Sequence, residues 1–62
     1  METQVAVKIA RLVEAAYKRI QAEDRIAALL FLDEAKSLAV RSLTGDDRNT
    51  AVATVLRIRA TI

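Results

Sequence analysis

The residues whose types could support catalysis are three pairs of adjacent carboxylates: Glu23-Asp24, Asp33-Glu34 and Asp46-Asp47. Two carboxylates act together on a substrate or a cation only if both reach the same point. Neighbouring residues of a helix point about 100° apart, so the members of each pair diverge. We therefore interpret the first and last pairs as helix caps and the middle pair as a solvent-exposed strip.

The rest of the composition offers little further chemistry. The chain has no cysteine, no histidine and a single glycine. Nucleophilic triads rely on Cys or His, structural zinc sites need the same residues, and phosphate-binding loops are rich in glycine. We therefore expect no enzyme activity, no cofactor and no metal ion.

Length and composition point to packed helices. The 62 residues form one domain, 53% of them apolar but only 3% aromatic, with no proline. Natural domains of this size usually rely on disulfides, a metal ion or a second subunit. The first two are excluded by residue type here, so self-association is the stabilising device that is still open.

Charge and hydropathy say little about the partner. Ten basic residues against eight acidic ones leave a net charge of +2. The longest apolar run, residues 26–32, is far shorter than the roughly 20 residues that span a bilayer. The first residues also lack a basic segment followed by an apolar one, which a secretory signal would show. The expectation is a cytoplasmic protein without a membrane span.

Apolar residues recur with helical periodicity along a first predicted helix, about 3–21, and a wide apolar face results. The phase then breaks, because Glu23 and Asp24 would fall in the middle of that face. Burying two unpaired carboxylates costs several kcal/mol. We therefore predict a turn at 22–25 with Asp24 capping the next helix, and the alternative is one long helix from 3 to 43.

The second predicted helix, 25–43, is apolar over more than half its circumference, and Ile26 and Leu30 fall outside even that arc. Such a helix needs neighbours on several sides. Thr44-Gly45 ends it, and a shorter helix over about 46–61 follows. Because residues 56–62 also alternate strictly between apolar and polar or small residues, a strand over 50–62 is the alternative.

The predicted fold class is all-α: a helical hairpin plus a shorter C-terminal helix, associating into a homo-oligomeric helical bundle. We expect apolar residues of both hairpin helices to form the surface through which the helices, and the subunits, pack together. Its members are Ile9, Leu12, Val13, Ala16, Tyr17, Ile20, Leu29, Leu30, Phe31, Leu32, Leu38 and Val40.

The predicted function is that of a small non-catalytic interaction protein, such as a regulator, adaptor or assembly factor. It would associate with itself, as a homodimer or tetramer, and dock on a protein partner. One alternative is a nucleic-acid-binding regulator that uses Arg48, Arg57 and Arg59 to contact phosphates. Another is a subunit or co-chaperone that folds only within a hetero-complex.

Overall fold

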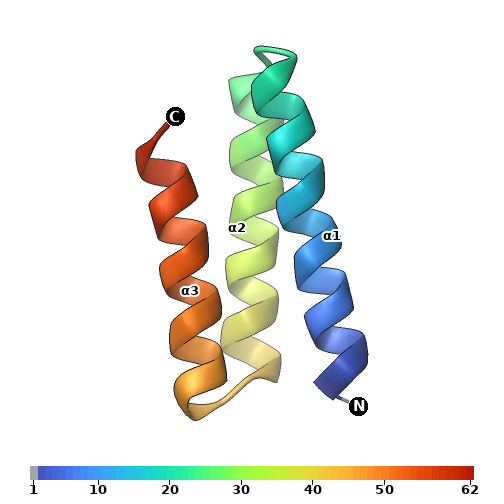
Figure 1. Ribbon diagram of the computed structural model, residues 1–62, viewed down its shortest axis with the longest axis vertical. Helices are drawn as coiled ribbons and strands as arrows, with labels where there is room; N and C mark the ends of the chain where they lie inside the picture. Colours follow the sequence, from blue (N-terminus) through green and yellow to red (C-terminus); the bar gives the residue numbers. More distant parts are fainter. Residues whose placement is uncertain (1) are drawn as a thin grey trace.

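The computed structural model describes residues 2–62, which form three helices and no strand (Figure 1). The helices are α1 (Glu2–Gln21), α2 (Arg25–Ser42) and α3 (Gly45–Ala60). The prediction of an all-helical chain is therefore confirmed, with a turn between α1 and α2 instead of one long helix. The alternative of a strand over 50–62 is wrong.

The turn between α1 and α2 is made without glycine or proline. The amide of Asp24 donates to the carbonyl of Arg19 (2.8 Å) and the amide of Glu23 to that of Ile20 (3.0 Å). This pair of bonds is the Schellman pattern, which needs a left-handed residue, and Glu23 supplies it at φ 61°. Asp24 then caps α2 by accepting from the amide of Ala27 (3.2 Å).

The connection between α2 and α3 consists of residues 43–44, both extended. Gly45 is left-handed (φ 59°), as expected for a glycine after a helix, but it is the first residue of α3. Asp46 and Asp47 lie in the first turn of α3. Their charges there are favourable, because the amino end of a helix carries a partial positive charge.

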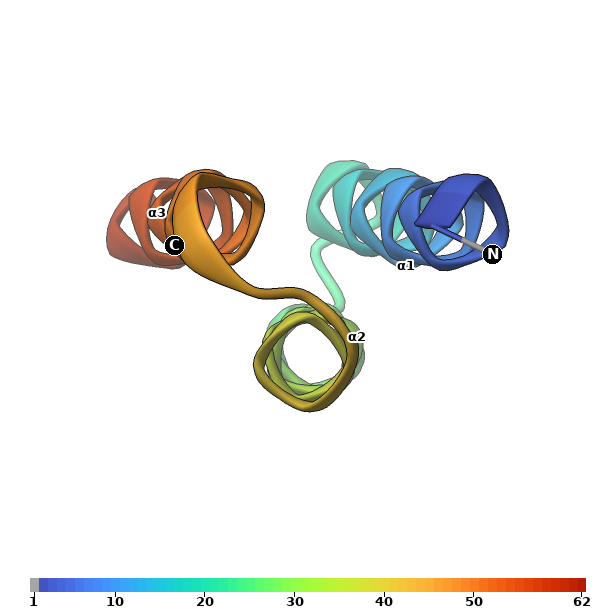
Figure 2. The same ribbon diagram turned by 90° about the horizontal axis from the view of Figure 1, so that it is seen from below.

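Helix α2 is the centre of the fold, and α1 and α3 each pack against it from the same side (Figure 2). The chain runs up, down and up, so that α1 and α3 point in the same direction (Figure 1). Most of the buried side chains form one cluster where the helices meet. The buried residues are Ile9, Ala16, Ala28, Leu32, Ala35, Ala39, Val55 and Ile58.

The two neighbours explain why α2 is apolar around so much of its circumference. Only the arc beyond both contacts is open to solvent, and there Ile26 and Leu30 are 76% and 66% exposed. These are the two residues that the helical pattern placed outside the apolar arc. Among residues 2–62, none of the three helices has both the length and the apolar character that crossing a bilayer requires.

Candidate functional site

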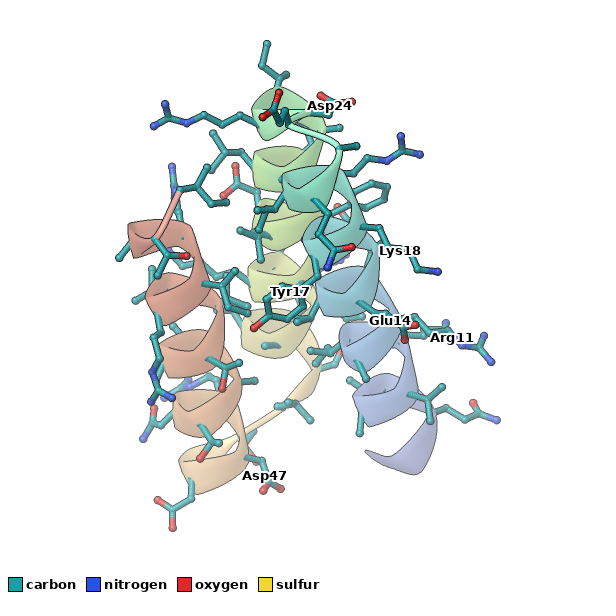
Figure 3. The ribbon with its side chains drawn as sticks, turned by 45° about the horizontal axis from the view of Figure 1, so that its top comes forward. Arg11, Glu14, Tyr17, Lys18, Asp24 and Asp47 are labelled. Carbon is teal, nitrogen blue, oxygen red and sulfur yellow. The ribbon has the colours of Figure 1, made fainter. Side chains whose placement is uncertain are left out.

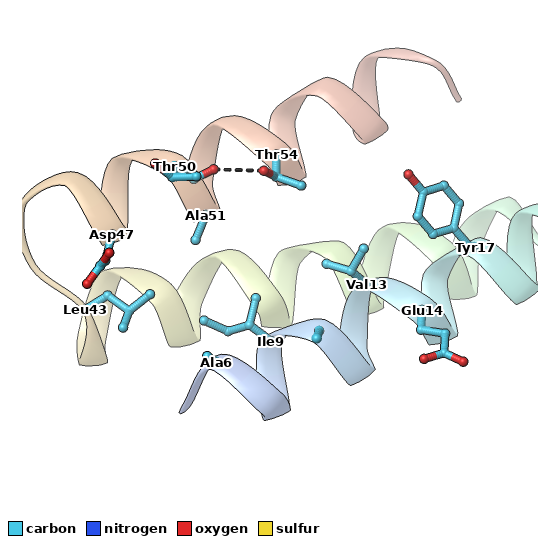
Figure 4. Close-up of a pocket in the computed structure, with 11 residues that line it drawn as sticks. Ala6, Ile9, Val13, Glu14, Tyr17, Leu43, Asp47, Thr50, Ala51 and Thr54 are labelled. Carbon is cyan, nitrogen blue, oxygen red and sulfur yellow. Dashed lines mark hydrogen bonds between the residues drawn. The ribbon is translucent and has the colours of Figure 1, made fainter. Parts of the chain in front are cut away.

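An open groove lies between α1 and α3, on the side away from α2 (Figures 3 and 4). Its volume is about 830 Å³, and its lining is mostly apolar. We call it the α1–α3 groove. It is lined by Ala6, Ile9, Ala10, Val13, Glu14 and Tyr17 of α1, by Leu43 of the connection, and by Asp47, Thr50, Ala51 and Thr54 of α3.

The wall that α1 contributes arises because this helix carries two apolar stripes. One stripe packs into the core through residues such as Leu12, Ala16 and Ile20. The second stripe faces the groove and recurs at steps of four, three and four residues, which keeps its members on one helical face. It consists of Ala6, Ala10, Val13 and Tyr17, and the Tyr17 side chain is half exposed.

The wall that α3 contributes is more polar. The Thr54 hydroxyl donates to the backbone carbonyl of Thr50 at 2.9 Å, so its proton is already satisfied within the helix (Figure 4). The ionisable groups of the lining are the carboxylates Glu14 and Asp47 and the phenol of Tyr17, with no basic residue among them. The groove can therefore hold an apolar surface and favours positive charge at its margins.

The three carboxylate pairs lie apart from the groove, except for Asp47. Asp33 is 3.4 Å from Arg59 of α3, and Glu34 is 3.9 Å from Arg41 of α2. All four side chains are about half exposed or more, so such ion pairs contribute little to stability. Within residues 2–62, no three acidic side chains come together in a way that could hold a metal ion.

The predicted packing residues fall into three environments. Ile9, Ala16 and Leu32 are buried, and a second group is partly buried against them: Leu12, Val13, Ile20, Phe31 and Leu38. Leu29 is of intermediate exposure, while Leu30 and Val40 are 66% and 51% exposed. Only Ile9, Val13 and Tyr17 of the predicted set line the groove.

Sequence reasoning missed the rest of the lining. Ala6 and Ala10 belong to the apolar face of the first helix, so the four-three-four spacing could have revealed them as a second stripe. No pattern in the sequence assigns Thr50 or Thr54 to the opposite wall, since that depends on how α3 packs.

The three arginines of the alternative function do not share one surface. Arg59 is directed to Asp33 by its ion pair. Arg57 precedes it by two residues and therefore points about 200° away around α3. Arg48, eleven residues before Arg59, returns to the same face as Arg59. A continuous basic stripe along α3 would need all three on one side.

Comparison with protein families, with curated proteins and with solved structures finds no match for this chain. The case for function therefore rests on the groove itself.

Proposed function

We propose that this chain is a small, non-catalytic interaction protein that works as a homodimer, with the α1–α3 grooves of two copies packed together. Such a dimer would act as a regulator, adaptor or assembly factor through its outer surface. The observation that carries the proposal is the groove: a mostly apolar, open surface with Tyr17 half exposed in it. Exposed apolar surface of this kind is typical of binding sites.

The total accessible surface supports association of the chain with a partner. The chain exposes 4517 Å², whereas a compact monomer of 6.8 kDa is expected to expose about 3,950 Å². The difference, about 560 Å², approaches the roughly 800 Å² that each partner buries in a standard protein interface. Packing a second copy against the chain would remove part of this surface from water.

The composition of the core supports the same conclusion. Four of the eight buried hydrophobic residues are alanines, and Leu32 and Val55 are the largest side chains that are fully buried. Alanines allow close approach of helices but bury little apolar area each. A domain this small with such a core is marginal alone, and the dimer would add burial of Val13 and Tyr17.

The direct test is the solution mass by sedimentation equilibrium over a wide concentration range. The wild type should reach twice the 6.8 kDa chain mass. Ala10→Glu should stay monomeric, because Ala10 is exposed in the single chain but would be buried, with a charge, in the dimer. Ala53→Glu is the matched control, since Ala53 is an exposed alanine in a helix outside the groove.

Circular dichroism on both variants would verify that their helices persist. A wild type that stays monomeric and helical at the highest concentration contradicts the proposal. So does a dimer that Ala10→Glu and Ala53→Glu leave equally intact, because the interface would then lie elsewhere.

A further inference from the structure

The outer face of α1 is basic between residues 8 and 19. Four basic side chains lie within an arc of about 100° around the helix, turned away from the core, and all four are exposed. Arg11 and Lys18 point to the same side, away from α3 (Figure 3). Glu14 lies at the border of this arc and lines the α1–α3 groove. The four residues, which we call the α1 basic face, are Lys8, Arg11, Lys18 and Arg19.

Helix α2 adds a fifth basic side chain beside this face. Arg41 lines a shallow depression between α1 and α2 together with Lys8 and Arg11. The carboxylate of this lining is Glu34, which is 3.9 Å from Arg41. Among the side chains that the structure describes, the ion pairs are those of Arg41 and Arg59. Within this part of the chain, the four cations of the α1 basic face therefore have no carboxylate partner, and their charge is available to an anion.

The composition of this surface decides which anion fits it. Between residues 8 and 19 only Ala15 lies among the cations, and Val7, 42% exposed, is at one end. Protein interfaces have an apolar core, and lipid surfaces take up apolar side chains, so neither matches this face. A nucleic-acid duplex presents a regular row of phosphates instead. From residue 8 to residue 19 the helix rises about 16 Å, and this length of duplex carries about nine phosphates.

We propose that the α1 basic face binds the phosphate backbone of double-stranded DNA, with Arg41 widening the contact. Contacts to phosphates carry no sequence information, so binding should not depend on base sequence. The face lies apart from the α1–α3 groove, so DNA and a second copy can bind at the same time, and a dimer would offer two such faces. The surface differs from that of the α3 arginines, which point to different sides of their helix.

Fluorescence anisotropy with a labelled duplex of about 20 base pairs tests the proposal, over a salt series from about 50 to 200 mM. Four phosphate contacts by one chain should weaken binding about 150-fold over this series, and a dimer that engages both faces should weaken more. Arg11→Ala with Lys18→Ala removes two contacts, so its loss per chain should be only about 12-fold. The matched control is Arg48→Ala with Arg57→Ala, which removes the same charge from exposed positions of α3 and should keep the wild-type salt dependence.

Two further anions, polyglutamate and vesicles that contain phosphatidylserine, are titrated in the same way. Either one binding as tightly as the duplex overturns the proposal, because the face would then suit an acidic protein or a membrane. So does an equal effect of the two double variants, which would mean that only total charge matters, or no binding of DNA at the lowest salt. Sedimentation reports separately on self-association: Arg11→Ala with Lys18→Ala should leave the mass unchanged, so a monomeric wild type that binds DNA refutes the dimer alone.

Discussion

Replacing Glu23 by glycine should stabilise the protein, because Glu23 holds a backbone conformation that side chains disfavour. Its φ of 61° is left-handed, and two backbone hydrogen bonds of the turn depend on it. A residue with a Cβ pays about 1–2 kcal/mol for this conformation. Glycine removes that cost, but it also lowers stability by about 0.5–1 kcal/mol because it gives the unfolded chain more conformational freedom. The net gain is about 0.5–1 kcal/mol.

Thermal unfolding followed by circular dichroism measures this gain. For a domain of this size, about 0.5–1 kcal/mol corresponds to a rise in Tm of roughly 2–8 °C. Glu23→Ala is the matched control: it removes the same charge from the same exposed site but keeps the Cβ, so it should gain nothing. Both variants are compared at one protein concentration, because association shifts Tm. A Glu23→Gly variant no more stable than Glu23→Ala would refute the strain at this turn.

Substitutions at three further positions probe the core and the two connections. Leu32→Ala, at the most buried large side chain, should cost about 2–5 kcal/mol in chemical denaturation, and Leu32→Asp should abolish the helical signal altogether. Asp24→Ala removes the cap on the amide of Ala27 and should lower stability by about 0.5–2 kcal/mol, whereas Asp24→Asn should keep most of it. In Gly45→Ala the new Cβ has no atom near it, but the alanine must adopt the left-handed φ of Gly45. The substitution should therefore lower the free energy of unfolding by about 1 kcal/mol without any steric clash.

The sequence was sufficient for the local structure because local signals agree with the packing. The turn at 22–25 has neither glycine nor proline, yet the phase of the apolar face breaks there, and Asp24 does cap α2. The final segment was ambiguous, because alternation and helical spacing overlap. In the structure this segment is a helix. Val55 and Ile58, three residues apart, are buried together, while Arg57 and Arg59 stay exposed on different sides of the helix.

The groove could not be predicted from the sequence, because it depends on which helices pack against one another. The width of the apolar face of α1 was evident, but its division into a stripe against α2 and a stripe against open space was not. That division is set by α3, whose groove-facing residues Thr50 and Thr54 lie more than 30 positions away from Tyr17. Likewise, the apolar arc of α2 indicated several neighbours without showing that α3 would supply the second.

The proposed dimer joins folding to association, and the two kinds of buried position can be separated by their response to concentration. Ligands or subunits that bind only the folded state stabilise it in proportion to the logarithm of their concentration. The Tm of the wild type should therefore rise with protein concentration. Leu32→Ala should lower Tm across the whole range, since Leu32 is buried within one chain. Ala10→Glu should instead remove the concentration dependence and leave the low-concentration Tm nearly unchanged, because Ala10 is exposed in the single chain and its partner lies across the α1–α3 groove.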